Sequence, residues 1–328
     1  MTKIASPPAT TYVEDRISAA VWEGLTALPK RLPPWLFYDE AGSRLFEEIT
    51  ELPEYYLTRT ERGIFSDHAG AMIARASGGQ LLRITELGAG SADKTRLLLA
   101  AAVASQGTVV YEPVDVSASA LEAAQERIES EFDGVRVAPR VADYTQGLGL
   151  EPAAPGERRL VLYIGSSIGN FEPWEAAELL ERVWDELQPG DGLLLGVDLI
   201  KQDSILLAAY DDQAGVTAAF NLNLLARLNR ELGACFDSQA FAHRAVWNAA
   251  ESRIEMHLVS RTAQTVRLDA LDLEADFAAG ESIHTENSYK YRPGQAEALL
   301  VAAGFAPVES WTDERGWFGV CLGRKASS

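Results

Sequence analysis

The sequence predicts an α/β protein with a doubly wound, mostly parallel sheet and a second, smaller lobe. Three observations support this fold. Between Gln80 and Ile200, short apolar strands alternate with amphipathic helices, which is typical of a parallel sheet covered on both faces. A glycine turn, Gly88-Ala89-Gly90, follows the first of these strands, and the chain ends in a helix and two strands joined by a tight turn.

The first strand, expected over 80–87, ends in the glycine turn, and a helix is expected over 92–103. Glycines let a ligand approach the backbone closely, and open α/β sheets bind cofactors at this end of their strands. A dinucleotide fingerprint would place a third glycine where Asp93 stands. The acidic Glu86 before the turn is instead typical of methyltransferases that use S-adenosylmethionine (SAM). A glycine pair alone is weak evidence, because many strand–helix turns contain one.

The alternation continues through the rest of this region. The expected elements are a strand at 108–114, a helix at 118–132, a strand near the sheet edge at 135–141, a loop at 143–157, a strand at 159–164, a helix at 174–187, a turn at 189–192 and a strand at 193–199.

The alternation then breaks, which indicates an inserted lobe. Residues 204–233 are largely helical, with one apolar face formed by Val216, Phe220, Leu224, Leu228 and Leu232. In the segment 254–258, apolar residues alternate with polar ones, as in a half-buried antiparallel strand, and a second such run at 265–268 follows a short turn. Residues before 80 are expected to be mostly helical.

The closing elements are a helix at 295–303, a strand at 308–312, a hairpin turn at 313–316 and a strand at 317–322. Sheets of class I SAM-dependent methyltransferases finish in this way, whereas dehydrogenase Rossmann domains do not. The sequence therefore predicts a Rossmann-like methyltransferase domain over 61–200 and 290–328. A smaller α+β substrate-binding lobe is expected over 1–60 and 201–289.

Composition limits the partners and the compartment. Among 328 residues, 48 Asp and Glu outnumber 29 Lys and Arg, giving a net charge of −19, which argues against nucleic acid or an anionic membrane as partner. No signal-peptide core or membrane-spanning stretch is visible. Because Cys235 and Cys321 lie far apart in the sequence, we expect no disulfide framework, which fits a reducing cytoplasm. The protein is also expected to be monomeric. The four histidines lack metal-ligand spacing, so no metal is expected.

Aromatic residues are frequent before residue 80. Phe37 and Phe46 are best interpreted as core residues. Tyr55 and Tyr56 are adjacent, so they are not expected to face the same core, and at least one hydroxyl is expected to reach a cleft.

Four segments carry a resemblance to a known family. They are 35–61 (WLFYDEAGSRLFEEITELPEYYLTRTE), 164–171 (IGSSIGNF), 209–221 (AYDDQAGVTAAFN) and 285–291 (TENSYKY). Together they closely resemble the L-histidine Nα-methyltransferases of ergothioneine biosynthesis, over about residues 32–322. The resemblance implies three successive methyl transfers from SAM to the α-amino nitrogen of L-histidine, giving hercynine.

The cofactor residues follow partly from position and partly from the resemblance. Gly88 and Gly90 would let the backbone approach the methionine part of SAM. Asp115, at the end of the second strand, stands where a carboxylate can accept both ribose hydroxyls, although a strand-end cap is an alternative. Asp143 and Tyr144 fall where adenine is held.

The resemblance also places Lys94 near the SAM carboxylate, whereas the position alone suggests a solvated helix lysine. Tyr144 is a mild departure, because the family commonly has Phe at this position.

For the amino acid, the resemblance assigns Asn170 and Tyr210 to the α-carboxylate and amino end. Its imidazole contacts fall on Glu286 and Ser288, with Tyr55 on the other side. A carboxylate and a hydroxyl can bind both ring nitrogens, one as acceptor and one as donor.

Two further residues match the family's site. Met256 matches a pocket residue, although a strand methionine is usually core. Tyr38 matches a residue near the reacting nitrogen, and we expect it to orient the amine, since an unperturbed phenol ionises only near pH ~10. The catalytic residues are thus expected to be Tyr38, Asn170 and Tyr210.

Three other functions also fit parts of the sequence. His284 and Asn287 depart from the family pattern beside the pocket motif, so a same-fold enzyme acting on another amino acid, such as tryptophan, is one alternative. Glu286 argues against it, because an indole cannot satisfy a buried carboxylate as an imidazole can. A non-catalytic SAM sensor and a dinucleotide oxidoreductase are the others.

Overall fold

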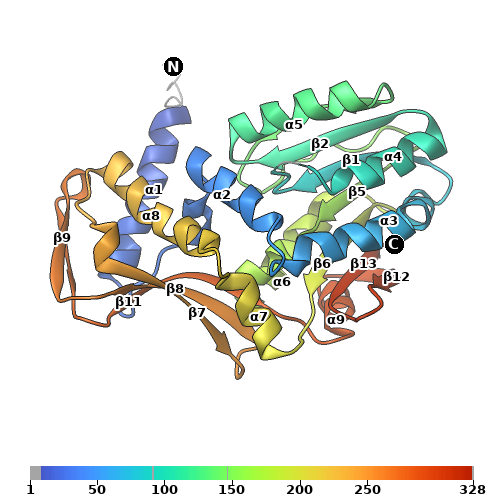
Figure 1. Ribbon diagram of the computed structural model, residues 1–328. Coiled ribbons are helices and arrows are strands. Elements are labelled where there is room, and N and C mark those ends of the chain that lie inside the picture. Colours follow the sequence, from blue (N-terminus) through green and yellow to red (C-terminus); the bar gives the residue numbers. More distant parts are fainter. Residues whose placement is uncertain (1–8, 91, 146, 327–328) are drawn as a thin grey trace, which may run out of the picture. The chain divides into compact units, whose positions relative to one another are not determined.

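The computed structural model describes residues 9–90, 92–145 and 147–326. The chain forms two compact units (Figure 1). The first, here called the appended unit, comprises Met1–Tyr55, Asp203–Ala249 and Arg253–Asn287. The second, the sheet unit, comprises Tyr56–Gln202, Ala250–Ser252 and Ser288–Ser328.

The sheet unit contains an eight-stranded sheet in the order β12-β13-β6-β5-β1-β2-β3, with β4 also paired to β2. Its strands are β1 (Leu81–Leu87), β2 (Val109–Asp115), β3 (Val135–Val137), β4 (Arg140–Val141), β5 (Glu157–Tyr163), β6 (Gly192–Asp198), β12 (Phe305–Thr312) and β13 (Phe318–Lys325). β13 runs antiparallel to both of its neighbours, β6 and β12, whereas the pairings among β1 to β6 are parallel. The strand order reverses at β1 and β5, which pair in parallel. This is the switch point at which such sheets bind ligands.

Helices cover both faces of this sheet. The helical elements of the unit are α3 (Tyr56–Ser77), α4 (Thr95–Gln106), α5 (Ala118–Glu131), η2 (Ser167–Asn170), α6 (Pro173–Glu186) and α9 (Gln295–Ala302). One apolar core joins α3, α4 and α5 to the sheet, and the other joins α6 and α9 to the opposite face. On β5, Leu160 and Leu162 enter the first core, and Val161 and Tyr163 the second. The expected doubly wound sheet is therefore confirmed.

Two expected elements differ in detail. The helix expected from residue 92 begins at Thr95, because Ala92 has φ +51° and lies in the left-handed region. The strand expected over 135–141 is divided into β3 and β4. Pro139 lies in the gap, and proline cannot donate a ladder hydrogen bond.

The appended unit is α+β. Its helical elements are α1 (Ala9–Thr26), η1 (Pro34–Phe37), α2 (Glu40–Thr50), α7 (Asp203–Tyr210), α8 (Val216–Leu232), η3 (Ser238–Ala240) and η4 (Asp269–Leu271). Its strands are β7 (Phe241–Asn248), β8 (Arg253–Ser260), β9 (Gln264–Leu268), β10 (Leu273–Phe277) and β11 (Ser282–Tyr289). They form a three-stranded sheet, β11-β8-β7, and a separate pair, β9-β10.

The apolar helical face and the alternating strand are confirmed. Ile254, Met256 and Leu258 of β8 are buried, and their neighbours are partly exposed. The helical segment expected over 204–233 is divided into α7 and α8. Asp212 caps the start of α8, because it accepts hydrogen bonds from the N–H groups of Val216 and Thr217.

In the described part of the chain, no helix is both long and apolar enough to span a bilayer. Cys235 and Cys321 are free thiols.

Candidate active site

The glycine turn brings three segments of the sheet unit together. Gly88 and Gly90 have φ of +67° and +49°, which glycine adopts without strain. The Gly88 N–H donates to the Val114 carbonyl at 2.8 Å. A Cβ at Gly88 would lie 3.6 Å from the ring of Tyr144. Gly88 and Tyr144 are thus neighbours.

Asp115 closes the second side of this turn. Its Oδ2 accepts from the Gly90 N–H at 3.2 Å, and its Oδ1 accepts from the Ser117 N–H at 2.9 Å. The side chain is partly exposed. Asp115 therefore holds local backbone at the carboxyl end of β2, and its role toward the ribose stays a prediction.

Asp143 and Tyr144 follow β4. Asp143 Oδ1 accepts from the N–H and the hydroxyl of Thr145, at 3.0 and 2.6 Å. The ring of Tyr144 lies 5.8 Å from that of Tyr163. Burial raises the pKa of Tyr144 to about 12, so the phenol stays neutral and offers an aromatic face with one polar group.

Glu86 is buried beneath the glycine turn. Its Oε2 accepts hydrogen bonds from Thr95 Oγ1, at 2.7 Å, and from the Tyr111 hydroxyl. Burial raises its pKa to about 7, although these hydrogen bonds act in the opposite direction. Glu86 therefore ties β1 to β2 and to the first turn of α4.

Lys94 is held by a glutamate that sequence analysis did not single out. The Lys94 ammonium forms an ion pair with Glu61 of α3, whose side chain is fully buried. Glu61 also accepts from the Gly165 N–H, at 2.9 and 3.0 Å to its two oxygens. It therefore links Lys94 to the loop after β5. No spacing rule distinguishes such a residue from an ordinary helix glutamate.

The loop after β5 leads to Asn170, the last residue of η2. Ser166 has φ +60°, and its Oγ accepts from the Asp198 N–H at 2.9 Å. A Cβ at Gly169 would lie 2.8 Å from the Tyr289 carbonyl, so no side chain fits there. Such backbone restraint is common at functional sites. The loop holds Asn170 beside the switch point of the sheet.

In the appended unit, three predicted substrate residues belong to one aromatic cluster. The ring of Tyr38 lies 5.7 Å from Phe46 and 5.8 Å from Phe220. Phe46 lies 6.2 Å from Tyr55, which lies 6.3 Å from Tyr210. Tyr55 is buried in this cluster, whereas Tyr56 packs on Trp317 in the sheet unit. The two adjacent tyrosines face different surroundings, as expected.

Polar anchors hold this cluster in place. Asp39, next to Tyr38, caps α2 by accepting from the Gly42 N–H at 2.7 Å and also binds Asn223 and Arg230 of α8. His243 Nε2 lies 2.8 Å from the Tyr210 carbonyl. Burial lowers the pKa of His243, and its Nδ1 faces the Asn221 amide nitrogen. We therefore assign Nε2 as the protonated nitrogen, donating to the Tyr210 carbonyl.

Met256, Glu286 and Ser288 lie on β8 and β11 and are exposed by only 2%, 8% and 3%. The Thr285 hydroxyl donates to the Met256 carbonyl at 3.0 Å, which joins the two strands. Lys290 Nζ donates to Ser288 Oγ at 2.8 Å.

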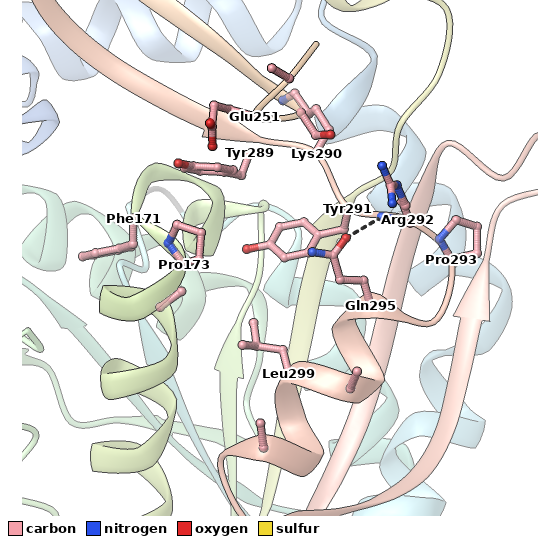
Figure 2. A pocket seen from close by; sticks show the side chains of 15 residues that line it. Phe171, Pro173, Glu251, Tyr289, Lys290, Tyr291, Arg292, Pro293, Gln295 and Leu299 are labelled. Carbon is pink, nitrogen blue, oxygen red and sulfur yellow. Dashed lines mark hydrogen bonds between the residues drawn. The ribbon is translucent and has the colours of Figure 1, made fainter. Parts of the chain in front are cut away.

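One pocket in the sheet unit, of about 700 Å³, is lined by residues of α6 and α9 and by segments 250–252 and 289–293 (Figure 2). Phe171, Tyr289, Tyr291 and Leu299 contribute apolar walls. None of the predicted site residues lines it. This pocket is therefore distinct from the predicted ligand positions.

The strand order, the closing antiparallel hairpin and the glycine turn at the switch point define a class I SAM-dependent methyltransferase. The sequence model of one family, described as "Histidine-specific methyltransferase, SAM-dependent", matches residues 17–325. The chain belongs to this family.

Individual relatives agree with membership in this family. The chain is 50% identical to a histidine N-alpha-methyltransferase of Mycolicibacterium smegmatis, over 97% of this chain and 98% of the relative. It is 46% identical to the protein of that name from Mycobacterium tuberculosis, over 93% and 94% of the two chains. A 4-dimethylallyltryptophan N-methyltransferase of Claviceps purpurea is 27% identical, over 93% and 94%.

Proposed function

We propose that the protein transfers three methyl groups in turn from SAM to the α-amino nitrogen of L-histidine. The product is hercynine, and the reaction is the first step of ergothioneine biosynthesis. Family membership and the high identity to two histidine N-alpha-methyltransferases support the reaction. The observation that carries the choice of substrate is Glu286, a buried carboxylate two residues from the hydroxyl of Ser288.

The residues around the glycine turn fit SAM. When bound, SAM supplies an electrophilic methyl group that a neutral amine displaces in line. Gly88 and Gly90 leave the backbone open for the methionine part, and Asp115 offers a carboxylate to the ribose. Asp143 and the neutral ring of Tyr144 would hold adenine. Lys94, which forms an ion pair with Glu61, would bind the methionine carboxylate.

The substrate roles follow the same pattern. Asn170 and Tyr210 bind the carboxylate and amino end of histidine, and Tyr38 orients the amine. Glu286 accepts the ring N–H, and Ser288 binds the second ring nitrogen. Tyr55 and Met256 complete the pocket wall. A pocket that depends on such hydrogen bonds discriminates against analogues that leave a buried group unpaired.

We further propose that the enzyme works as a cytoplasmic monomer, with two lobes over 61–200 with 290–328 and 1–60 with 201–289. Its acidic surface, with a net charge of −19, is unsuited to nucleic acid or anionic lipid.

The test is a substrate panel. The purified protein is incubated with SAM and each of L-histidine, L-tryptophan and 4-dimethylallyl-L-tryptophan, and each amino acid is followed by mass spectrometry. We expect histidine alone to gain three methyl groups. Methylation of an indole substrate with histidine unchanged would instead favour the alternative suggested by the Claviceps relative.

A further inference from the structure

A buried charge cluster lies at the carboxyl end of β6. Asp198 and the side chains of Lys201 and Lys290 are all at most 3% exposed. Lys201 Nζ lies 2.5 Å from Asp198 Oδ1, and Lys290 Nζ lies 2.8 Å from Asp198 Oδ2. The Tyr56 hydroxyl donates to Asp198 Oδ2 at 2.7 Å. Two ammonium groups thus share one carboxylate, an arrangement that is costly to bury.

The two lysines differ in their other contacts. Lys201 Nζ donates to the Tyr56 hydroxyl, at 2.8 Å, and to the Leu199 carbonyl. Lys290 Nζ donates instead to Ser288 Oγ at 2.8 Å. Of the two lysines, Lys290 is therefore the one whose described contacts connect this cluster to a residue with a proposed substrate role.

The contact fixes how Ser288 hydrogen-bonds. An ammonium group has three donors and no acceptor, whereas a hydroxyl can both donate and accept. Ser288 Oγ must therefore accept a hydrogen bond from Lys290. The hydroxyl proton of Ser288 is then directed to a different acceptor. Glu286, two residues earlier on β11, acts only as an acceptor when ionised.

We propose that Lys290 is a positioning residue that makes Ser288 a hydrogen-bond donor to the bare nitrogen of the substrate imidazole. Glu286 then accepts the N–H of the other ring nitrogen. The pocket selects one neutral tautomer of the ring. This inference rests on the proposed function and adds to it the protonation state of the bound substrate.

The hydrogen-bonding role of Ser288 bears on the protonation of the ring. An imidazolium has an N–H donor on both ring nitrogens, so it would leave the Ser288 hydroxyl facing a second donor, and that mismatch disfavours the protonated ring. The nearby charges act in both directions, because the Lys290 ammonium repels an imidazolium and the Glu286 carboxylate attracts it.

The first test uses matched lysine variants. Lys290→Met and Lys201→Met each remove one ammonium from Asp198, but only the first removes the contact to Ser288. We expect Lys290→Met and Ser288→Ala each to lower kcat/KM for L-histidine about tenfold or more. Lys201→Met should lower it by less than about threefold. The double variant of Lys290→Met and Ser288→Ala should be no worse than either alone, because the two residues act as one unit.

Two controls separate positioning from loss of structure. The Kd for SAM, measured by calorimetry, should stay within about twofold in the lysine variants. The inhibition constant of β-(2-thienyl)-L-alanine, whose ring has no N–H, should be unchanged in Lys290→Met. Equal losses in both lysine variants, or additive losses in the double variant, would overturn the inference while leaving histidine methylation in place.

The second test needs no variant. L-Histidine labelled with nitrogen-15 in the ring is bound to the wild-type enzyme with S-adenosylhomocysteine and observed by NMR. We expect one protonated and one bare ring nitrogen at pH 6, where much of free histidine is protonated. Two protonated nitrogens in the bound ring would refute the inference. Failure of the wild-type enzyme to methylate histidine would instead remove the proposed function on which the inference rests.

Discussion

At the scale of single residues, the most consequential feature of the cofactor region is the carboxyl group of Glu86. It is buried, and burial raises its pKa to about 7, against an ordinary value near 4.5. Between these two values the folded protein keeps a proton that the unfolded chain releases. The contribution of Glu86 to the free energy of unfolding is therefore present below pH 4.5 and is lost as the pH rises toward 7.

Glu86→Gln should remove this dependence. One Glu86 oxygen accepts from both Thr95 and Tyr111, and the amide oxygen of glutamine can do the same without a charge. We expect the variant to gain thermal stability over the wild type at pH 8 and to gain less at pH 5, as measured by calorimetry. Glu122→Gln, on the exposed face of α5, is the control and should follow the wild type at both pH values. An equal effect at both pH values would show that Glu86 is already ionised in the fold.

Glu286 carries the substrate prediction at the same scale. Glu286→Ala removes the proposed acceptor for the ring N–H and should lower kcat/KM for L-histidine about tenfold or more. The Kd for SAM should not change. Glu286→Gln keeps an acceptor oxygen and should lose less. A ratio that is unchanged in the alanine variant would exclude Glu286 from imidazole recognition.

At the scale of elements, the turn after β1 decides how closely a cofactor can approach the backbone. Gly88→Ala places a Cβ 3.6 Å from the Tyr144 ring at φ +67°. Gly79, before the same strand, also has a positive φ of +87°, but a Cβ there meets nothing within 4 Å. Both alanine variants should lose about 1 kcal/mol or more of unfolding free energy through backbone strain. Only Gly88→Ala should weaken SAM binding in calorimetry, and equal affinities in the two variants would contradict the proposed cofactor position.

The start of α2 positions Tyr38. Although burial raises the pKa of Asp39, hydrogen bonds from Gly42, Arg230 and Asn223 lower it below its ordinary value, so its stabilising contribution is lost as the pH falls through the acid range. Asp39→Ala should cost about 1 kcal/mol through the lost cap and raise KM for histidine. Asp39→Asn keeps the cap oxygen and should lose less stability in thermal unfolding. Identical losses of stability in the two variants would show that Asp39 stabilises the fold through its charge and not through the cap hydrogen bond.

Elements with a strong local pattern could be predicted from the sequence, and those that depend on distant partners could not. The strands of the main sheet and α5, α6 and α9 lie close to their expected ranges, because their apolar periodicity is clear. The appended unit was harder: the segment 265–268 pairs with β10 and not with β8, and β7 and β11 were not predicted. β11 is largely polar, and the apolar residues of β7 do not alternate strictly with polar ones, so pairing with β8 rather than hydrophobic alternation determines both strands.

The same contrast holds for the site. The glycine turn and Asp115 follow from their places after strands, and their proximity is observed. Glu61, Asp198 and Lys290 were not predicted, because a buried ion pair depends on which side chains meet in space. The roles of Glu286, Ser288 and Asn170 came from family resemblance and remain predictions.

At the scale of the whole molecule, the fold predicts a single class of cofactor. Ligands that bind only the native state raise its unfolding free energy, by about 2.7 kcal/mol at a hundredfold excess over Kd. SAM should therefore raise Tm by several degrees, and NAD⁺ at the same concentration should not. A shift with NAD⁺ and none with SAM would contradict the placement in this class, whereas a shift with SAM but no methyl transfer to any amino acid would indicate a SAM sensor.

The central claim is that histidine is methylated three times on its α-amino nitrogen. The most direct test supplies SAM with a deuterated methyl group and L-histidine to the wild-type enzyme and locates the label by tandem mass spectrometry. The structure and family predict three labelled methyl groups, all on the α-nitrogen. Label on the imidazole ring or the carboxylate, or a product that stops at one methyl group, would contradict the proposed reaction.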